Sequence, residues 1–367
     1  MQLKVLLVCF LLFYPVLYAQ RSGIWTAFYN RDSTLIGYKD YHGTVQIPAK
    51  FTEFTTAMRF KDIIGVSEKS GAAWKSYYIN KAGRKFGADS LYITDNTPDC
   101  ENEGYIRFRD RKTDKVGMFN RHGKTVIPAV YDELSKVRNG MIVGLKGADK
   151  RYMHEDREKD GDNYYVWTGG KELLIDTLNK VLSEKFTSHA SLNFYSVSHS
   201  SKPSADRIRK NFPAADGRYY SFIDFKEEFR HWFSKELLRK LSPEKLTRMS
   251  SDSIVWESRN GWAKTHGRTF VRKNYDLLRK SLLDFNNPNA EVALFLQDLN
   301  PFIYEGPDFK TYFNNCDEAE TWKYPVMSVV FTYRTGNDLA QNHFDFLRTK
   351  KGYRLISVTL RTDSLTP

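Results

Sequence analysis

The pattern of apolar and polar positions divides the chain into two parts with different periods. In the first half, short apolar runs alternate with polar turns, and glycines stand 40 residues apart at Gly43, Gly83 and Gly123. In the second half, apolar residues recur at steps of three and four, for example between residues 271 and 285. Short bounded apolar runs are typical of strands, and steps of three and four indicate helices. The pattern therefore predicts a β-rich first half and a second half that begins with helices.

Four turns in the first half share one kind of chemistry. Each begins with Asp or Asn and ends three residues later with Gly or Asn. The first side chain can accept hydrogen bonds from the backbone ahead of it, and the last residue tolerates positive φ. These are the features of tight β-hairpins. The predicted turn pairs are Asp40 with Gly43, Asn80 with Gly83, Asn120 with Gly123, and Asp176 with Asn179.

The surroundings of the first and third turns resemble WG repeats, the short β repeats of many exported bacterial proteins. Both units continue from the turn glycine to an Ile-Pro pair, Ile47-Pro48 and Ile127-Pro128. Tyr38 and Met118 occupy the position of the Trp that names the family. The resemblance implies a β-hairpin repeat array over residues 20–190. It also implies a binding or interaction module, and no catalytic residues.

The remaining chain predicts a linker over residues 191–217 and a separate domain over residues 218–367. Asp224 and Ser242 are typical helix N-caps, and a third helix is expected over 271–285. Apolar runs at 326–333, 343–348 and 353–360 predict strands, with a hairpin between the last two. The predicted fold class is therefore α+β, with helices packed on an antiparallel sheet. This order is similar to that of the NTF2-like cone, which encloses a pocket.

The first 19 of the 367 residues form a predicted secretory signal peptide, cleaved between Ala19 and Gln20. Lys4 is followed by an uncharged run from residue 5 to residue 19. No later apolar stretch reaches the length of a membrane span. The sequence therefore predicts export to the periplasm, cell surface or medium, with no transmembrane segment in the mature chain.

The charge balance changes the picture by indicating an anionic partner. The chain has 56 Lys and Arg against 44 Asp and Glu, a formal net charge of +12. Basic pairs at Arg272-Lys273 and Arg279-Lys280 fall on one side of the third predicted helix. Such a side suits lipopolysaccharide or peptidoglycan carboxylates, and it is also typical of a solvated helix face. Export and the lack of a known motif argue against nucleic acid.

Two cysteines remain after the signal peptide, Cys100 and Cys316. Both have acidic neighbours, which disfavour the thiolate, so neither has the character of an activated nucleophile. In an oxidising compartment the two can form one long-range disulfide. The alternative is two separate buried thiols.

Candidate chemistry is sparse. The known motifs of nucleophilic, metal and nucleotide sites are absent from the sequence. An acidic cluster suits either Ca²⁺ or a solvated loop, and no metal or other cofactor is predicted; the cluster comprises Asp95, Asp99, Glu101 and Glu103. His343 and Asp345 alternate on one predicted strand and so share a face. With Tyr324 nearby, they are the best candidates for a pocket with acid–base chemistry.

These observations favour an exported, non-catalytic binding protein of the cell envelope. Its β repeats would contact a protein or an anionic envelope polymer. The alternative is an enzyme or small-ligand binder that uses a pocket around His343 and Asp345 in the second domain. The oligomeric state is not indicated by the sequence.

Overall fold

The computed structural model describes residues 23–71, 73–152, 165–258, 261–335 and 338–366. The predicted signal peptide and its cleavage site at Ala19 and Gln20 lie outside these residues. The fold is mostly β, with 50% strand and 13% helix. The predicted α+β class, with helices packed on an antiparallel sheet, is therefore wrong. Strands also form in some segments between and after the helices. The apolar periodicity alone did not assign these segments to a sheet.

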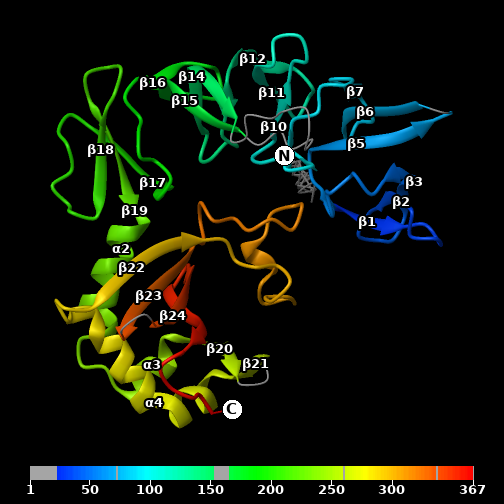
Figure 1. Cartoon of the computed structure of the whole chain (residues 1–367). Helices are drawn as coiled ribbons and strands as arrows, with labels where there is room; N and C mark the ends of the chain where they lie inside the picture. The colour runs from blue at the N-terminus through cyan, green and yellow to red at the C-terminus, as the bar shows by residue number, and fades with distance from the viewer. Residues whose placement is uncertain (1–22, 72, 153–164, 259–260, 336–337, 367) are drawn as a thin grey trace, which may run out of the picture.

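The first half consists of three-stranded antiparallel meanders, each with a predicted turn between its second and third strands (Figure 1). The first two meanders join, with β4 (Arg59–Phe60), in one seven-stranded sheet. The four meanders are β1 (Trp25–Tyr29), β2 (Leu35–Lys39) and β3 (Val45–Thr52); β5 (Ile63–Ser70), β6 (Ala73–Asn80) and β7 (Lys85–Phe86); β10 (Tyr105–Arg109), β11 (Val116–Asn120) and β12 (Thr125–Tyr131); and β14 (Met141–Tyr152), β15 (Tyr165–Asp176) and β16 (Val181–Ser183).

The turn chemistry is the same in all four meanders. In the first, the Asp40 carboxylate accepts hydrogen bonds from the backbone N–H of His42 at 2.9 Å and of Thr44 at 3.0 Å. In the last, the Asp176 carboxylate accepts them from Leu178 and Lys180, both at 2.9 Å. The turn-ending residues all have positive φ: Gly43, Gly83, Gly123 and Asn179 at 86°, 78°, 70° and 65°. A local side-chain acceptor and a residue that tolerates the left-handed region therefore set each turn.

Residues 191–217, predicted as a linker, instead form part of a further sheet. β17 (Leu192–Ser200) and β18 (Arg209–Pro213) both pair with β19 (Tyr219–Asp224). Phe194, Phe212 and Phe222 from the three strands pack in one small core. The polar composition of this segment reflects its exposed face and loops, and the alternating aromatic residues supply its buried face.

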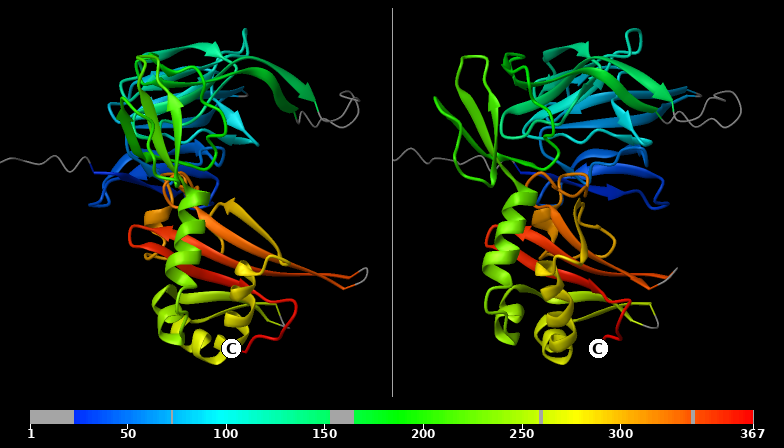
Figure 2. Two further views of the ribbon diagram at one scale, coloured as in Figure 1. Left: turned by 90° about the vertical axis from the view of Figure 1, so that its left-hand side faces the viewer. Right: turned by 60° about the vertical axis from the view of Figure 1, so that its left-hand side comes forward.

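The repeat array comprises residues 23–224. It forms an arc of small sheets above the C-terminal unit, residues 225–366, and helix α2 descends from the end of the arc (Figures 1 and 2). Its apolar residues are divided among several small cores, each shared by neighbouring meanders. Two further short pairings complete it: β8 (Ile93–Thr94) with β9 (Thr97–Pro98), and β13 (Glu133–Leu134) with β14. The meanders thus bury their faces against one another.

The described residues of the C-terminal unit include three α-helices: α2 (Phe225–Trp232), α3 (Pro243–Arg248) and α4 (Gly267–Leu283). A π-helical turn, Phe233–Leu237, extends α2, and a 3₁₀ turn, Asp284–Asn286, follows α4. The Asp224 carboxylate caps α2 by accepting from the Lys226 N–H at 2.8 Å. The Ser242 hydroxyl caps α3 by accepting from the Lys245 N–H at 3.2 Å. These helices begin where side-chain caps replace the missing intrahelical partners.

The sheet of the C-terminal unit has six strands in the order β21, β20, β25, β24, β23, β22. It is mixed, because β20 pairs with β25 in parallel. One face shares a large core with α2 and α4, in which Phe229, Leu278 and Phe346 are fully buried. The strands are β20 (Ser250–Ser258), β21 (Gly261–His266), β22 (Glu291–Gln297), β23 (Val326–Thr335), β24 (Asp338–Thr349) and β25 (Gly352–Thr359).

The segment between β22 and β23, residues 298–325, covers part of the other sheet face and reaches the repeat array. We call it the strap. It contains the 3₁₀ turn Lys310–Tyr312, and its Leu299 and Tyr304 pack on Val326, Leu347 and Ile356 of the sheet. Figure 1 shows the strap in orange between the arc and the sheet.

A disulfide fastens the strap to the repeat array. Cys100 and Cys316 are bonded across a sequence separation of 216 residues. Close by, the Arg59 backbone N–H donates to the Asn315 carbonyl at 2.9 Å, and Lys136 pairs with Glu318. The strap is therefore held to the array by covalent, backbone and ionic contacts together.

No helix in the described part of the chain is both long enough and apolar enough to span a membrane.

Candidate functional site

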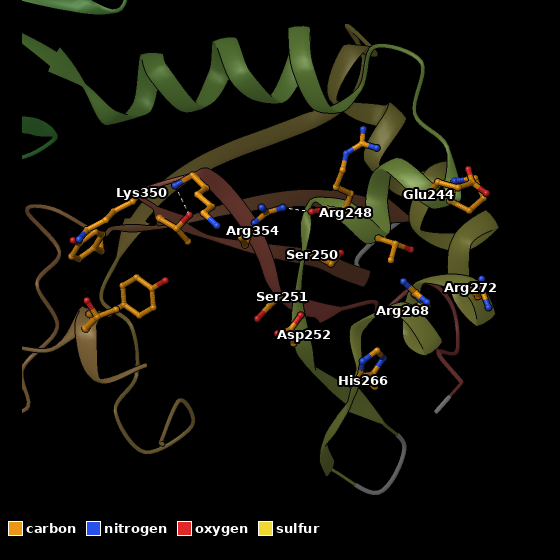
Figure 3. Close-up of a pocket in the computed structure, with 17 residues that line it drawn as sticks. Glu244, Arg248, Ser250, Ser251, Asp252, His266, Arg268, Arg272, Lys350 and Arg354 are labelled. Atoms are coloured by element: carbon orange, nitrogen blue, oxygen red, sulfur yellow. Dashed lines mark hydrogen bonds between the residues drawn. The ribbon is translucent and has the colours of Figure 1, made fainter. Parts of the chain in front are cut away.

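A basic pocket of about 1190 Å³ lies at one end of the C-terminal sheet. It is bounded by α3, the start of β20, the start of α4, the β24–β25 turn and the strap, as Figure 3 shows. Its lining residues are Pro243, Glu244, Thr247, Arg248, Ser250, Ser251, Asp252, His266, Arg268, Arg272, Thr311, Tyr312, Tyr324, Thr349, Lys350, Lys351 and Arg354.

Local backbone geometry brings these elements together. Helix α4 starts directly against β20, and a Cβ at Gly267 would lie 2.2 Å from the Ser251 carbonyl oxygen. Only glycine therefore permits this approach. On the other side, the tight turn Thr349–Gly352 turns the chain back into β25, so that Lys350 and Lys351 extend over the pocket. The sequence thus places basic residues from four separate segments around one opening.

The pocket has an excess of positive charge. Six side chains are cationic and two are carboxylates, Glu244 and Asp252; the cations are Arg248, Arg268, Arg272, Lys350, Lys351 and Arg354. Among the described residues, none of these six forms an ion pair with a carboxylate. Arg354 instead donates to the Arg248 backbone carbonyl. Uncompensated cations around a hollow raise the local concentration of anions.

The start of α4 adds to this potential. His266 is the N-cap residue of α4, and its side chain makes no hydrogen bond to the helix. The first N–H groups of α4 therefore lack a side-chain cap. A helix of 17 residues also places the positive end of its dipole here. Figure 3 shows Arg268 projecting from this helix start, with Ser251 and Asp252 between it and Arg354.

The carboxylate at the rim is held in its charged form. Hydrogen bonds from its own backbone N–H and from the Ser242 hydroxyl lower the pKa of Glu244, and the charge of Arg272 lowers it further.

On the opposite side of the pocket, Tyr312 and Tyr324 of the strap meet edge to face, with ring centroids 5.1 Å apart. Burial raises the pKa of the Tyr312 hydroxyl. The pocket therefore combines a cationic floor with a small aromatic edge.

The structure does not bring His343, Asp345 and Tyr324 into one pocket. Tyr324 lines the basic pocket, whereas His343 and Asp345 do not. Asp345 lies on β24 between Ser328 and Ser357 of the flanking strands. Burial raises the pKa of the Asp345 carboxyl, and the neighbouring Ser328 and His343 partly offset this.

Burial raises the pKa of the Tyr304 hydroxyl of the strap, and the charge of Asp345 adds to this. Asp345 is thus a partly buried carboxyl on the sheet face that the strap covers. It does not line the basic pocket.

The acidic cluster is used for structural contacts. Asp99 forms a bidentate pair with Arg107, with Nη2–Oδ1 at 2.6 Å and Nε–Oδ2 at 3.0 Å. Glu101 accepts from the Gly104 N–H at 2.6 Å, and Glu103 accepts from the Asn139 N–H at 2.7 Å. In the described residues, no group of three His, Cys, Asp or Glu side chains is placed to hold a metal.

Most of the basic pocket was not predicted from the sequence. Of its cations only Arg272 belongs to a basic pair noted there, and its neighbour Lys273 does not line the pocket. Arg248, Arg268 and Arg354 come from three different elements, so no local spacing links them. The one available signal was the +5 excess of Lys and Arg over Asp and Glu in residues 221–285.

Comparison with known proteins gives no further assignment. No protein-family model matches the chain, and no curated protein matches it.

Proposed function

We propose that this chain is an exported, non-catalytic binding protein that holds an anionic polymer of the cell envelope in the basic pocket. The observation behind the proposal is the set of six cations around one hollow without a carboxylate partner in the described residues. Ion pairing with phosphate or carboxylate groups is the interaction that such a set favours.

Export and the WG-like nature of the repeats form part of the same proposal. They rest on the sequence of residues 1–20 and on the four Asp- or Asn-initiated turns. In this view the repeat array is a rigid support and a second contact surface. The strap links the two, because it lines the basic pocket with Thr311, Tyr312 and Tyr324 and is bonded to the array through Cys316.

The enzyme alternative has less support. His343 and Asp345 would need a cavity that admits a substrate, and they do not line the basic pocket. The basic pocket itself pairs no nucleophile with a base in the described residues. We therefore make binding, and not catalysis, the proposed function.

The experiment is a binding titration with lipopolysaccharide and with purified peptidoglycan at low and high salt. At least one should bind, and binding should weaken as salt screens the cations. Arg268→Glu and Lys350→Glu should each weaken it by about tenfold, the effect expected for losing one charge-assisted contact. Lys273→Glu is the matched control, since Lys273 lies beside Arg272 on α4 but outside the pocket.

Three results would count against the proposal. The first is that neither polymer binds, and the second is that binding is insensitive to salt. The third is that Lys273→Glu weakens binding as much as Arg268→Glu does. The last outcome would assign the effect to the overall charge of the domain and not to the pocket.

A further inference from the structure

A second cavity, of about 1130 Å³, lies in the repeat array where it meets the strap. It is lined by residues of the β8–β9 hairpin, β10, β13, β14 and β15, by His189 and by Glu318 of the strap. From its composition we infer that this aromatic groove is a binding site for a neutral sugar chain. Its defining residues are Tyr92, Arg107, Glu133, Tyr165, Trp167 and Glu172.

The groove has aromatic side chains in fixed orientations. Tyr165 and Trp167 alternate on β15 and meet edge to face, with ring centroids 5.3 Å apart and planes at 78°. The ammonium of Lys150 lies 4.2 Å from the Tyr165 ring centroid. On the other side, the Arg107 guanidinium lies 4.0 Å from the Tyr92 ring centroid. Tyr92 is buried, so the partly exposed Tyr165 and Trp167 are the rings on which a ligand can stack at low entropic cost.

Two glycines let the same strand supply both the rings and a carboxylate. Gly169 and Gly170 lie between Trp167 and Glu172 and have φ of 69° and 77°. A Cβ at Gly170 would lie 2.8 Å from the Ala148 Cβ. The left-handed pair changes the direction of the following side chains, so Glu172 lines the groove despite its odd spacing from Trp167.

Most charged groups of the groove already have a partner, in contrast to those of the basic pocket; among the described residues Asp95 is the exception. Arg107 is paired with Asp99 at 2.6 Å, and Arg109 with Glu133 at 3.4 Å. Glu172 meets the His189 Nε2 at 3.0 Å, and Glu318 pairs with Lys136. Because both of its arginines are paired, the groove offers no free cation to an anionic ligand. It retains hydrogen-bonding capacity, because each carboxylate has further lone pairs.

These properties together match sugar and not peptide. A pyranose has an apolar C–H face that can stack on a ring and hydroxyls that donate to carboxylates. The groove supplies both within one cavity, with Glu172 36% exposed beside the rings. A peptide bound by strand addition would instead need an open strand edge, with alternate pockets for its side chains.

The experiment is calorimetric titration of the purified protein with two neutral hexasaccharides, cellohexaose and hexa-N-acetylchitohexaose, supplemented by a printed array of neutral glycans. At least one neutral glycan should bind, with little dependence on salt. Trp167→Ala should weaken binding by about tenfold or more. Trp74→Ala is the matched control, because Trp74 is 62% exposed on β6 and lies outside the groove.

A second variant distinguishes loss of the binding site from loss of folding. Glu172→Gln keeps the side-chain shape and removes the charged acceptor, and it should weaken binding severalfold. Arg268→Glu, in the basic pocket, should leave glycan binding unchanged. Loss of anion binding at the basic pocket and loss of glycan binding at the groove can therefore be told apart.

Absence of binding to every neutral glycan overturns the inference. Equal weakening by Trp74→Ala and Trp167→Ala overturns it as well. Binding of a peptide that depends on Trp167, with no glycan bound, would assign the groove to peptides instead.

Discussion

The repeat array and the C-terminal unit bury their apolar residues in different ways. The array divides them among small cores such as that of Tyr38, Phe51 and Phe60, each shared by adjacent strands. The C-terminal unit gathers α2, α4 and most of its sheet around one core that includes Phe229 and Phe346. Local cores make stability a sum of neighbouring contacts, whereas one large core makes it cooperative. The two regions should therefore respond differently to the same kind of damage.

The largest effect is expected in the C-terminal core. Phe346 is fully buried and packs on Phe229, Trp232 and Phe233. Phe346→Ala should lower the free energy of unfolding by about 3–5 kcal/mol. Hydrogen exchange should then rise throughout α2, α4 and β23–β25, because these elements share the core.

Phe51→Ala in the array is the matched comparison. Phe51 is also fully buried, but its core involves the first two meanders and Cys316 of the strap. Faster exchange should stay within β1–β6 and the neighbouring strap. If it spreads to β14–β19 as well, the array is a single cooperative unit and the contrast between the regions is wrong.

A smaller effect is expected from the bond that joins the regions. Cys316→Ser, or reduction of the wild type, should lower the free energy of unfolding by about 2–4 kcal/mol. It should also separate one urea transition into two, measured by circular dichroism and tryptophan fluorescence. Reductant should leave the Cys316→Ser variant unchanged. If reductant does not change the urea transition of the wild type, the other strap contacts are enough to hold the two regions together.

The smallest effect concerns pH and has opposite signs in the two regions. Burial raises the pKa of Asp99, but the charge and hydrogen bonds of Arg107 outweigh it and hold that pKa below the ordinary value of 3.8. The stability that Asp99 contributes is therefore present above that ordinary value, and it is lost as the pH falls through the depressed folded pKa. Asp345 has a raised pKa because it is buried, so its contribution is present at low pH and is lost as the pH rises through the folded value.

Asp345→Asn should accordingly raise the melting temperature at neutral pH and change it little below the ordinary pKa of an Asp. Asp99→Asn should lower the melting temperature at neutral pH, because Arg107 would lose its buried partner. Melting curves of the two variants across pH test this. A drop in melting temperature for Asp345→Asn at neutral pH would mean that the carboxylate has a stabilising partner. It would contradict the predicted increase in stability.

What could be predicted from the sequence was local. The turn from Asp40 to Gly43 and the helix cap at Ser242 depend on residues within four positions of each other, so their chemistry is visible in the printed chain. The parallel pairing of Val255 with Ser357 is not, because about a hundred residues separate them. The same limit applies to the candidate site, since Arg248, Arg268 and Arg354 converge only after the sheet has formed.

The linker prediction failed for a related reason. Polar residues such as Ser198, His199 and Ser200 dominate that segment, and they occupy exposed or partly exposed positions on β17. Phe194, Phe212 and Phe222 give the segment its core, but their spacing becomes an alternating pattern only when the strands are paired. The order of strands, β17-β19-β18, is likewise not readable from chain order.

The disulfide between Cys100 and Cys316 also determines how the protein would transmit mechanical force. A pull on the two chain ends passes through the bond and so bypasses the 216-residue separation that it spans. Extended chain measures roughly 3.5 Å per residue, so about 750 Å of contour length would be withheld while the bond is intact. The third and fourth meanders and β17–β19 lie inside the bonded loop and would be shielded from the load. The first two meanders and β23–β25, with Lys350 and Arg354 of the basic pocket, lie outside the loop and would lengthen. The same protein with a reduced bond would extend almost completely.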